Sequence, residues 1–214
     1  MKDNLTSLVV VMDASGSMAK LAADTRGSFN TFIKEQKAVQ GEATLSLWTF
    51  NSVAERVYNS VPLSDVQDLD DKSYKPVGNT ALLDTLGAAI DAEGQRLAAL
   101  DEKDRPSKVL VMVVTDGEEN ASQTFTKEKV REMVSHQQDK YNWSFLFLGA
   151  NIDAFKGGTS LGFAANNSVG YTPTRGGTSR LYANVSDNVS KYRSKIGSAA
   201  MNWSGDNTPP ADKK

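Results

Sequence analysis

The sequence predicts an α/β fold in which helices cover both faces of a mostly parallel β-sheet. Two stretches, LVVVM at residues 8–12 and VLVMVVT at residues 109–115, are uninterrupted apolar runs rich in β-branched residues. Such runs are typical of strands buried on both faces, as the central strands of parallel sheets are. Segments with helical spacing of apolar residues alternate with strand-like runs along the whole chain, which is the pattern of an α/β/α sandwich.

The N-terminal half is expected to contain a strand, an amphipathic helix and a hairpin. After the first strand, core-facing positions recur at helical spacing as far as Lys37: Leu21, Thr25, Phe29, Phe32 and Ile33. Residues 43–50 (ATLSLWTF) are rich in β-forming residues and predict the second strand. Residues 54–58 follow a turn and predict its hairpin partner, an antiparallel strand at the edge of the sheet. The polar run at residues 64–75 predicts a loop or a short surface helix.

The C-terminal half continues the alternation. A helix is expected over residues 80–100, with apolar positions at Leu83, Leu86, Ala89, Ile90, Leu97 and Leu100. After the apolar strand at residues 109–115 comes a helix that carries Val130, Met133 and Val134. A strand over residues 143–149 (WSFLFLG), a short helix over residues 150–160 and a weak strand at residues 168–171 follow. The last helix is indicated by Leu181, Val185, Val189, Tyr192 and Ile196.

Length and composition favour a single domain. The chain has 214 residues, of which 39% are hydrophobic and 23% charged, and this is enough for a sizeable core. We expect one domain over residues 1–197 and a loose tail over residues 198–214, which lack periodicity. The N-terminus has no charged-then-apolar leader, and no apolar run approaches the ~20 residues of a membrane span. The expected location is therefore the cytoplasm.

Charge and cysteine content argue against several classes of function. The 24 basic and 26 acidic residues give a net charge of −2, which offers no electrostatic footprint for nucleic acid or an anionic membrane. The chain has no cysteine, so disulfides, thiolate nucleophiles and cysteine-based zinc sites are excluded.

The first strand ends in a polar turn, Asp13-Ala14-Ser15-Gly16-Ser17, with a carboxylate and two hydroxyls at alternate positions. Alternate residues of an extended or turning backbone point the same way, so Asp13, Ser15 and Ser17 can converge on one point. A hard divalent cation such as Mg²⁺ prefers oxygen ligands of this kind. Alternatively, these residues cap the following helix by accepting from its free backbone N–H groups. The motif alone leaves both interpretations open.

Two further segments place oxygen-bearing side chains beside glycine, Gly78-Asn79-Thr80 and Thr115-Asp116-Gly117. Ligand sites of open α/β sheets form beyond the carboxyl ends of the strands. The turns at Asp13 and Asp116 follow the two most apolar strands, which we expect to be neighbours at the centre of the sheet. Thr80 is expected to open a helix near the same crevice. The three segments together favour a metal site over a helix cap.

The arrangement resembles the von Willebrand factor A (vWA) domain and its metal-ion-dependent adhesion site (MIDAS). In that family a first-strand Asp-x-Ser-x-Ser, a threonine from a distal loop and an aspartate after the fourth strand surround one divalent cation. The matching residues occur here in the same order: Asp13, Ser15, Ser17, Thr80 and Asp116. The stretches VVVMDASGSM, GNTALLDTL and VVTDGEEN also resemble intracellular bacterial and bacteriophage members, and the likeness covers roughly residues 5–150.

This resemblance implies a three-layer, Rossmann-like fold and a non-catalytic protein-binding module that depends on a metal. Ser15 and Ser17 would bind the cation through hydroxyls, and Thr80, Asp13 and Asp116 would bind directly or through water. The expected cation is Mg²⁺ or Mn²⁺, ahead of Ca²⁺. In the family, an open position on the metal accepts a Glu or Asp side chain from a partner protein. An AAA+ ATPase, or a host protein if the chain is from a phage, is a candidate partner; neither nucleic acid nor a membrane is expected.

Two other functions fit parts of the sequence. A Mg²⁺-dependent phosphohydrolase would use Asp13 as its nucleophile, but haloacid-dehalogenase-type enzymes carry a second aspartate two residues later, where this chain has Ser15. A purely structural domain would keep the motif without binding metal.

The remaining polar and aromatic residues have simpler interpretations. Asp84, Glu118 and Glu119 fit favourable positions near a helix N-terminus better than a place at the rim of a metal site. His136 lies in a polar stretch and is expected at the surface. Trp48, Trp143 and Phe145 fall within predicted strands and are expected in the core.

Overall fold

The computed structural model describes residues 1–117, 119–150, 153–172 and 174–194. Within these ranges six strands form one sheet in the order β3-β2-β1-β4-β5-β6. Neighbouring strands are parallel, except that β3 runs antiparallel to β2 at one edge. The strands are β1 (Lys2–Asp13), β2 (Glu42–Phe50), β3 (Ala54–Pro62), β4 (Pro106–Thr115), β5 (Ser144–Ala150) and β6 (Ser168–Tyr171). The predicted fold class, including the antiparallel edge strand, is confirmed.

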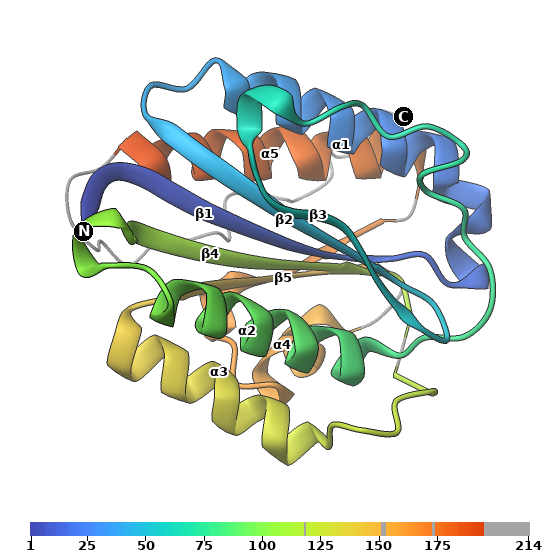
Figure 1. Cartoon of the computed structure of the whole chain (residues 1–214). Coiled ribbons are helices and arrows are strands. Elements are labelled where there is room, and N and C mark those ends of the chain that lie inside the picture. The colour runs from blue at the N-terminus through green and yellow to red at the C-terminus, as the bar shows by residue number, and fades with distance from the viewer. Residues whose placement is uncertain (118, 151–152, 173, 195–214) are drawn as a thin grey trace.

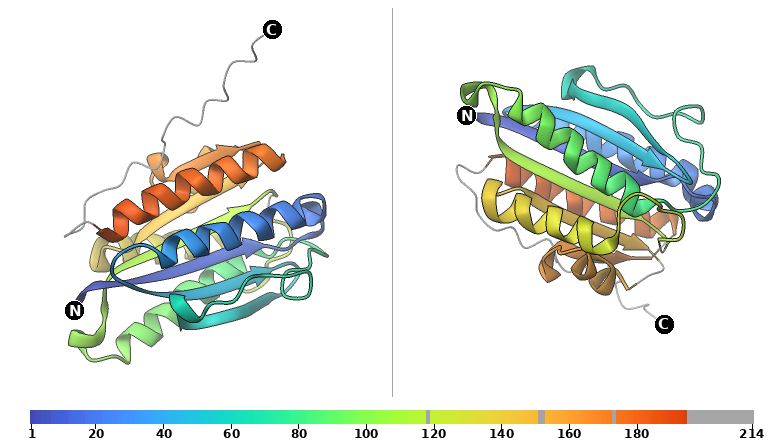
Figure 2. Two further views of the ribbon diagram at one scale, coloured as in Figure 1. Left: turned by 90° about the horizontal axis from the view of Figure 1, so that it is seen from above. Right: turned by 60° about the horizontal axis from the view of Figure 1, so that its bottom comes forward.

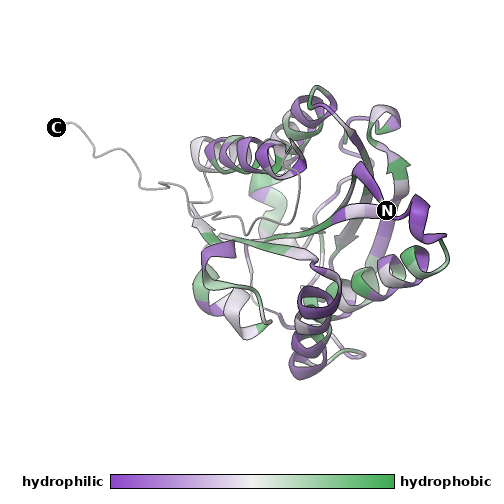
Figure 3. Cartoon of the chain, turned by 90° about the vertical axis from the view of Figure 1, so that its left-hand side faces the viewer, coloured by the Kyte–Doolittle hydropathy of each residue, from purple (hydrophilic) through white to green (hydrophobic). Residues whose placement is uncertain are grey.

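Helices cover both faces of this sheet, as Figure 1 shows. One face carries α1 and α5, which lie side by side, and the other carries α2, α3 and α4 (Figure 2). An end-on view shows the three layers (Figure 3). The bounds are α1 (Ala22–Lys37), α2 (Leu82–Ala98), α3 (Lys127–Tyr141), α4 (Ala154–Ser160) and α5 (Arg175–Ser194). Short 3₁₀ helices lie at η1 (Gly16–Leu21), η2 (Leu63–Asp65), η3 (Glu102–Asp104) and η4 (Ala165–Asn167).

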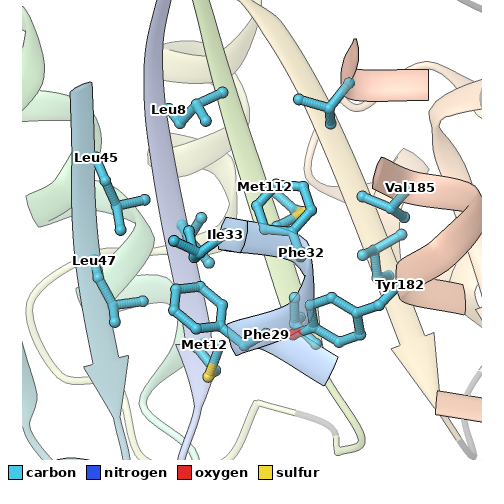
Figure 4. Packing of buried hydrophobic residues seen from close by; sticks show 14 of the residues in the cluster. Leu8, Met12, Phe29, Phe32, Ile33, Leu45, Leu47, Met112, Tyr182 and Val185 are labelled. Carbon is cyan, nitrogen blue, oxygen red and sulfur yellow. The ribbon is translucent and has the colours of Figure 1, made fainter. Parts of the chain in front are cut away.

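The core is divided between the two faces by the alternation of side chains along each strand. Leu8, Val10 and Met12 of β1 pack toward α1 and α5, whereas Val9 and Val11 pack toward α2. On the first face, aromatic and aliphatic side chains of α1 and α5 lie over the strands (Figure 4). Because β1 and β4 are covered on both faces, their sequences are continuous apolar runs rather than alternating ones.

Polar contacts between α1 and α5 join the beginning and the end of the described chain. Gln36 Nε2 donates to Ser186 O at 2.9 Å and to Ser190 Oγ at 3.0 Å. Arg193, which is buried, donates to the backbone oxygens of Gln36 and Gly41. These contacts hold α1 and α5 together where their apolar faces also meet.

A charged pair is buried between β1 and α2. Glu93, with only 3% of its surface exposed, accepts from Ser7 Oγ at 2.6 Å. Arg96 donates to the two carboxylate oxygens of Glu93 from Nη2 at 2.6 Å and Nε at 2.9 Å. This two-pronged contact satisfies a carboxylate that would otherwise be costly to bury.

Several element boundaries differ from those predicted. β3 continues to Pro62, beyond the predicted end at residue 58, and Ser60 adopts a left-handed φ of 51° where its pairing with β2 is irregular. α5 begins at Arg175, ahead of the first periodic apolar position, Leu181. α2 begins at Leu82, so Thr80 precedes the helix rather than opening it. The predicted tail at residues 198–214 lies outside the described residues.

The aromatic residues and the histidine lie where the sequence predicts. Trp48, Trp143 and Phe145 are buried, and His136 is exposed on α3. No helix in the described ranges is both long enough and apolar enough to cross a membrane.

Candidate metal centre

The candidate site lies at the carboxyl edge of the parallel strands, on the right in Figure 1. β1 and β4 are direct neighbours, with Met12 paired to Val114, so Asp13 and Thr115 end the two strands side by side. Thr115 Oγ1 donates to Asp13 Oδ2 at 2.5 Å. The prediction that the two most apolar strands are adjacent is therefore confirmed, and their adjacency brings the first and third sequence segments together.

A chain of hydrogen bonds links the first strand's turn to the fourth strand's aspartate. The backbone N–H of Ser15 donates to Asp13 Oδ1 at 2.7 Å, and Ser15 Oγ lies 3.0 Å from Ser17 Oγ. Ser17 Oγ donates to Asp116 Oδ1 at 2.6 Å. Four of the predicted ligands thus form a continuous polar cluster, although 99 residues separate Ser17 from Asp116.

The helix-cap interpretation is not what this turn shows. Ser15 occupies the N-cap position of η1, but its side chain makes no capping hydrogen bond. Its hydroxyl lies against Ser17, and that of Ser17 against Asp116. Both hydroxyls are therefore directed into the cluster rather than toward the N–H groups of the helix.

The fifth predicted ligand, Thr80, reaches the cluster from the loop before α2. A Cβ atom placed on Gly117 would lie 3.6 Å from Thr80 Oγ1 and 3.8 Å from Ser17 Oγ, so both hydroxyls border the same point. Asn120 fixes the backbone of Thr80, because it accepts from Thr80 N at 2.9 Å and donates to Thr80 O at 3.1 Å. The structure thus brings all five predicted residues to one place.

The electrostatics of the cluster are unfavourable without a cation. Burial raises the pKa of the Asp13 carboxyl above its usual value. Hydrogen bonds from Ser15 and Thr115 oppose that rise, and the charge of Asp116 adds to it. In the described ranges the ion pairs include neither Asp13 nor Asp116. A bound cation would compensate both carboxylates.

The donor set fits a small, hard cation. Oxygens on neighbouring corners of an octahedron with metal bonds of about 2.0–2.1 Å lie about 2.9 Å apart. Ser15 Oγ and Ser17 Oγ are 3.0 Å apart, and Ser17 Oγ and Asp116 Oδ1 are 2.6 Å apart. No group of three or more His, Cys, Asp or Glu side chains suited to a metal occurs among the described residues. The site would therefore rely on two carboxylates and three hydroxyls, an all-oxygen set that suits Mg²⁺ or Mn²⁺.

Three residues support the site without being among the five predicted ligands. Thr115 orients Asp13, and Asn120 positions Thr80. Tyr74, which is buried, donates its hydroxyl to the backbone oxygen of Asp13. Thr115 is the last residue of β4, the strand next to β1, so the pairing of these two strands would have placed its side chain beside Asp13. Tyr74 and Asn120 lie in irregular segments, where no strand or helix pattern indicates which way a side chain points.

The acidic neighbours of the site anchor the loop that follows β4. Glu119 accepts from Leu83 N at 2.9 Å, in the first turn of α2, which agrees with the predicted place near a helix N-terminus. Asp84 accepts from the backbone N–H groups of residues 123, 124 and 125 at 2.7–2.8 Å. Glu118 lies outside the described residues. Asp84 and Glu119 therefore hold the loop at residues 119–125 against α2.

Replacing Asp84 with Asn is expected to loosen this loop. Partial burial acts to raise the pKa of Asp84, but the backbone donors outweigh it, and the net pKa lies below the usual 3.8. The stabilisation is therefore present above pH 3.8 and lost as the pH falls through the lower native pKa. Asp84→Asn should lower the free energy of unfolding by about 1–2 kcal/mol. In wild type, the amide chemical shifts of residues 123–125 should titrate with a midpoint below 3.8; a midpoint at or above that value contradicts the assignment.

Comparison with known proteins identifies the fold. No protein-family model matches the sequence, and no curated protein matches it either. Solved structures do match. A von Willebrand factor type A protein from Catenulispora acidiphila superposes with a TM-score of 0.54 at 14% identity, over 86% of this chain and 42% of that one.

Two further solved structures have the same likeness. Proximal thread matrix protein 1 from the mussel byssus, described with a zinc-occupied MIDAS motif, gives a TM-score of 0.60 at 16% identity, over 86% of this chain and 46% of that one. The ArnB paralog VWA2 from Sulfolobus acidocaldarius gives a TM-score of 0.50 at 14% identity, over 85% of this chain and 44% of that one. The chain spans less than half the length of these structures. At such identities the likeness establishes the architecture alone, and this chain has the vWA fold.

Proposed function

We propose that the chain is a non-catalytic protein-binding module that depends on a divalent cation, Mg²⁺ or Mn²⁺. The observation that carries this proposal is the hydrogen-bonded cluster of Asp13, Ser15, Ser17 and Asp116, with the Thr80 hydroxyl beside it. Three distant segments contribute to it, at the edge where α/β folds bind ligands. The mussel protein, which has the same fold and is described with a zinc-occupied MIDAS motif, supports the proposal of a divalent cation here.

Each residue of the cluster has a distinct part in the proposal. Ser15, Ser17 and Thr80 supply neutral hydroxyl ligands. Both oxygens of Asp13 already accept hydrogen bonds from Ser15 N and Thr115 Oγ1, so Asp13 would act through a bound water. Asp116 supplies the second carboxylate. When bound, the cation supplies positive charge that these ligands do not fully neutralise, and it would attract a Glu or Asp side chain of a partner.

Exposed apolar side chains around the site favour a protein as the partner. Val53 is 70% exposed, Val77 49% and Phe155 56%, and all three lie at the carboxyl edge of the sheet. Val53 belongs to the β2–β3 turn, Val77 to the loop before α2, and Phe155 to the first turn of α4. Apolar groups beside a charged anchor are typical of protein interfaces. The proposed partner is an AAA+ ATPase or, if the chain is from a phage, a host protein, which presents an acidic residue to the cation. We propose that they meet in the cytoplasm.

The alternative of a phosphohydrolase with Asp13 as nucleophile has less support. The Asp13 side chain is fully buried, and protein donors occupy both of its oxygens. A nucleophile must reach the atom that it attacks, which this placement hinders. Ser15 also stands where a second acid would be needed for proton transfer.

The test of the proposal combines metal titration with affinity capture. Wild type should bind Mg²⁺ in isothermal titration calorimetry and should retain a partner from native lysate in Mg²⁺ but release it in EDTA. Asp13→Ala and Ser17→Ala should lose both properties. Asp139→Ala, a change on an exposed part of α3, is the matched control and should keep them. Capture that neither EDTA nor Asp13→Ala reduces would overturn the proposal.

A further inference from the structure

Three tyrosine side chains lie on the face of the sheet that α1 and α5 cover. Tyr74 and Tyr182 are buried within the apolar cluster of this face, and Tyr171, the last residue of β6, packs against it. Tyr182 extends from α5 toward Phe29 of α1 (Figure 4). Because a buried tyrosine hydroxyl normally has a hydrogen-bond partner, the partner of each hydroxyl is informative.

Only one of these three hydroxyls has a partner within the described chain. Tyr74 donates to the backbone oxygen of Asp13 at the candidate metal centre. The Tyr182 hydroxyl is buried without a hydrogen bond to any described residue. The hydrogen bonds among the described residues do not include the Tyr171 hydroxyl either. Polar groups in such positions commonly bind ordered water.

The strand register places Tyr171 in the same row of the sheet as Asp116. Tyr171 pairs with Ala150 of β5, and the residue before Ala150, Gly149, pairs with Thr115 at the end of β4. Ala150 therefore lies between Tyr171 and the residue that follows Thr115, which is Asp116. Since Ala150 carries only a methyl group, no large side chain of β5 separates the two.

Tyr171 and Asp116 also belong to the same face. Side chains alternate along a strand, and Val169 and Val114, each two residues earlier, both pack in the cluster under α1 and α5. Neighbouring strands lie about 4.8 Å apart, so about 10 Å separates the backbones of Tyr171 and Asp116. An aspartate and a tyrosine side chain that lean toward each other can span most of that gap.

The charges of the metal centre act on the Tyr171 hydroxyl. Burial raises the pKa of Tyr171, and the charges of Asp116 and then Asp13 add to the rise. For Tyr182 the contribution added to burial comes from Tyr171, which places Tyr182 on the far side of Tyr171 from the carboxylates. The Tyr171 hydroxyl therefore stays protonated at neutral pH and is available as a donor.

Asp116 has one carboxylate oxygen without a donor from the described chain. Its Oδ1 accepts from Ser17 Oγ at 2.6 Å, whereas Oδ2 accepts from no described residue. A water molecule beside Oδ2 could donate to it and accept from the Tyr171 hydroxyl. Cations such as Mg²⁺ usually keep several of their waters when they bind to a protein.

We propose that the Tyr171 hydroxyl belongs to the metal centre as a positioning group, which hydrogen-bonds to a water molecule of the bound cation beside Asp116 Oδ2. This inference rests on the proposed function, because it requires the cation. Tyr171 would hold that water without being a ligand itself, and groups that fix the ligands of a metal raise its affinity. The site then also depends on β6, a strand to which none of the five predicted ligands belongs.

Tyr171→Phe tests this inference, because it removes the hydroxyl and keeps the ring. Its affinity for Mg²⁺ in isothermal titration calorimetry should be lower than that of wild type by at least about tenfold. Its unfolding by urea in EDTA should match that of wild type, since the hydroxyl has no partner in the described chain. The electron paramagnetic resonance spectrum of bound Mn²⁺ should change, because the surroundings of a metal-bound water change.

Tyr182→Phe is the matched control. It removes a buried hydroxyl from the same face of the sheet, but one that lies farther from Asp116. This variant should retain both the Mg²⁺ affinity and the Mn²⁺ spectrum of wild type.

The outcomes separate this inference from the proposed function. Wild-type Mg²⁺ affinity in Tyr171→Phe, with an unchanged Mn²⁺ spectrum, would overturn the inference and leave the proposed function standing. An equal loss of affinity in Tyr182→Phe would overturn it too, because the effect would then come from the packing of this face. Lower stability of Tyr171→Phe in EDTA would assign the hydroxyl to the fold instead. A wild-type protein that binds neither Mg²⁺ nor Mn²⁺ would overturn the proposed function, and this inference with it.

Discussion

Asp116→Asn is expected to leave the metal-free protein at least as stable as wild type and to abolish its stabilisation by Mg²⁺. The charge of Asp116 adds to the burial that raises the pKa of Asp13, so its removal relieves repulsion. The Asn oxygen can still accept from Ser17, as Asp116 Oδ1 does now. At Mg²⁺ concentrations about 100 times the Kd, the free energy of unfolding of wild type should rise by about 2.7 kcal/mol, and that of the variant should hardly change.

Unfolding by urea, in EDTA and at a series of Mg²⁺ concentrations, measures both parts of this expectation. Asp139→Asn, an exposed change on α3, should behave as wild type under every condition. The reversal of order between EDTA and Mg²⁺ is the distinctive result, since a merely damaged fold would be weaker in both. Equal stabilisation of wild type and Asp116→Asn by Mg²⁺ would contradict Asp116 as a ligand.

Arg96→Met is expected to destabilise the fold by about 3 kcal/mol. The change removes the two-pronged contact with Glu93 and leaves that carboxylate, 3% exposed, with Ser7 alone. An uncompensated buried charge is costly, and the partial exposure of Arg96 (25% for its side chain) places the cost at the lower end of the usual range.

A double variant shows whether the cost comes from the stranded charge. The double variant Glu93→Met/Arg96→Met should have a free energy of unfolding within about 1–2 kcal/mol of wild type, because an apolar pair can replace a buried ion pair. Arg180→Met on the exposed side of α5 serves as a control and should change stability little. A double variant as unstable as Arg96→Met would mean that lost packing, not stranded charge, dominates.

The central part of the fold and the site could be predicted because their signals are local. The apolar runs at residues 8–12 and 109–115 are decisive for central strands, and strands of this kind end at one edge of a parallel sheet. Once β1 and β4 are placed side by side, Asp13 and Asp116 must be near each other. The place of Thr115 beside Asp13 follows from the same pairing, although only its neighbour Asp116 is predicted as a ligand.

Other features depend on contacts that no local pattern reveals. Tyr74 lies in a polar run, yet its hydroxyl reaches the backbone of Asp13, 61 residues away. The start of α5 was missed because Gly176 and Gly177 weaken the helical pattern, and only the fold shows why glycine suits position 177. A Cβ there would lie 2.0 Å from Thr172 O. β3 extends beyond its predicted end because it continues to pair with β2 after an irregularity in which Ser60 adopts a left-handed conformation.

The pairing of α1 with α5 has a consequence for how the chain is made. Gln36 and Arg193 touch although 157 residues separate them, so the side of α1 that faces α5 is covered only after α5 has been synthesised. Until then Phe32 lacks its contact with Tyr182 of α5, whose ring centroid lies 6.3 Å from its own. Nascent chains that expose such surfaces are prone to aggregate and depend on chaperones. The residues proposed to hold the cation all precede α5, so α5 can join the fold only after the proposed binding edge has been translated.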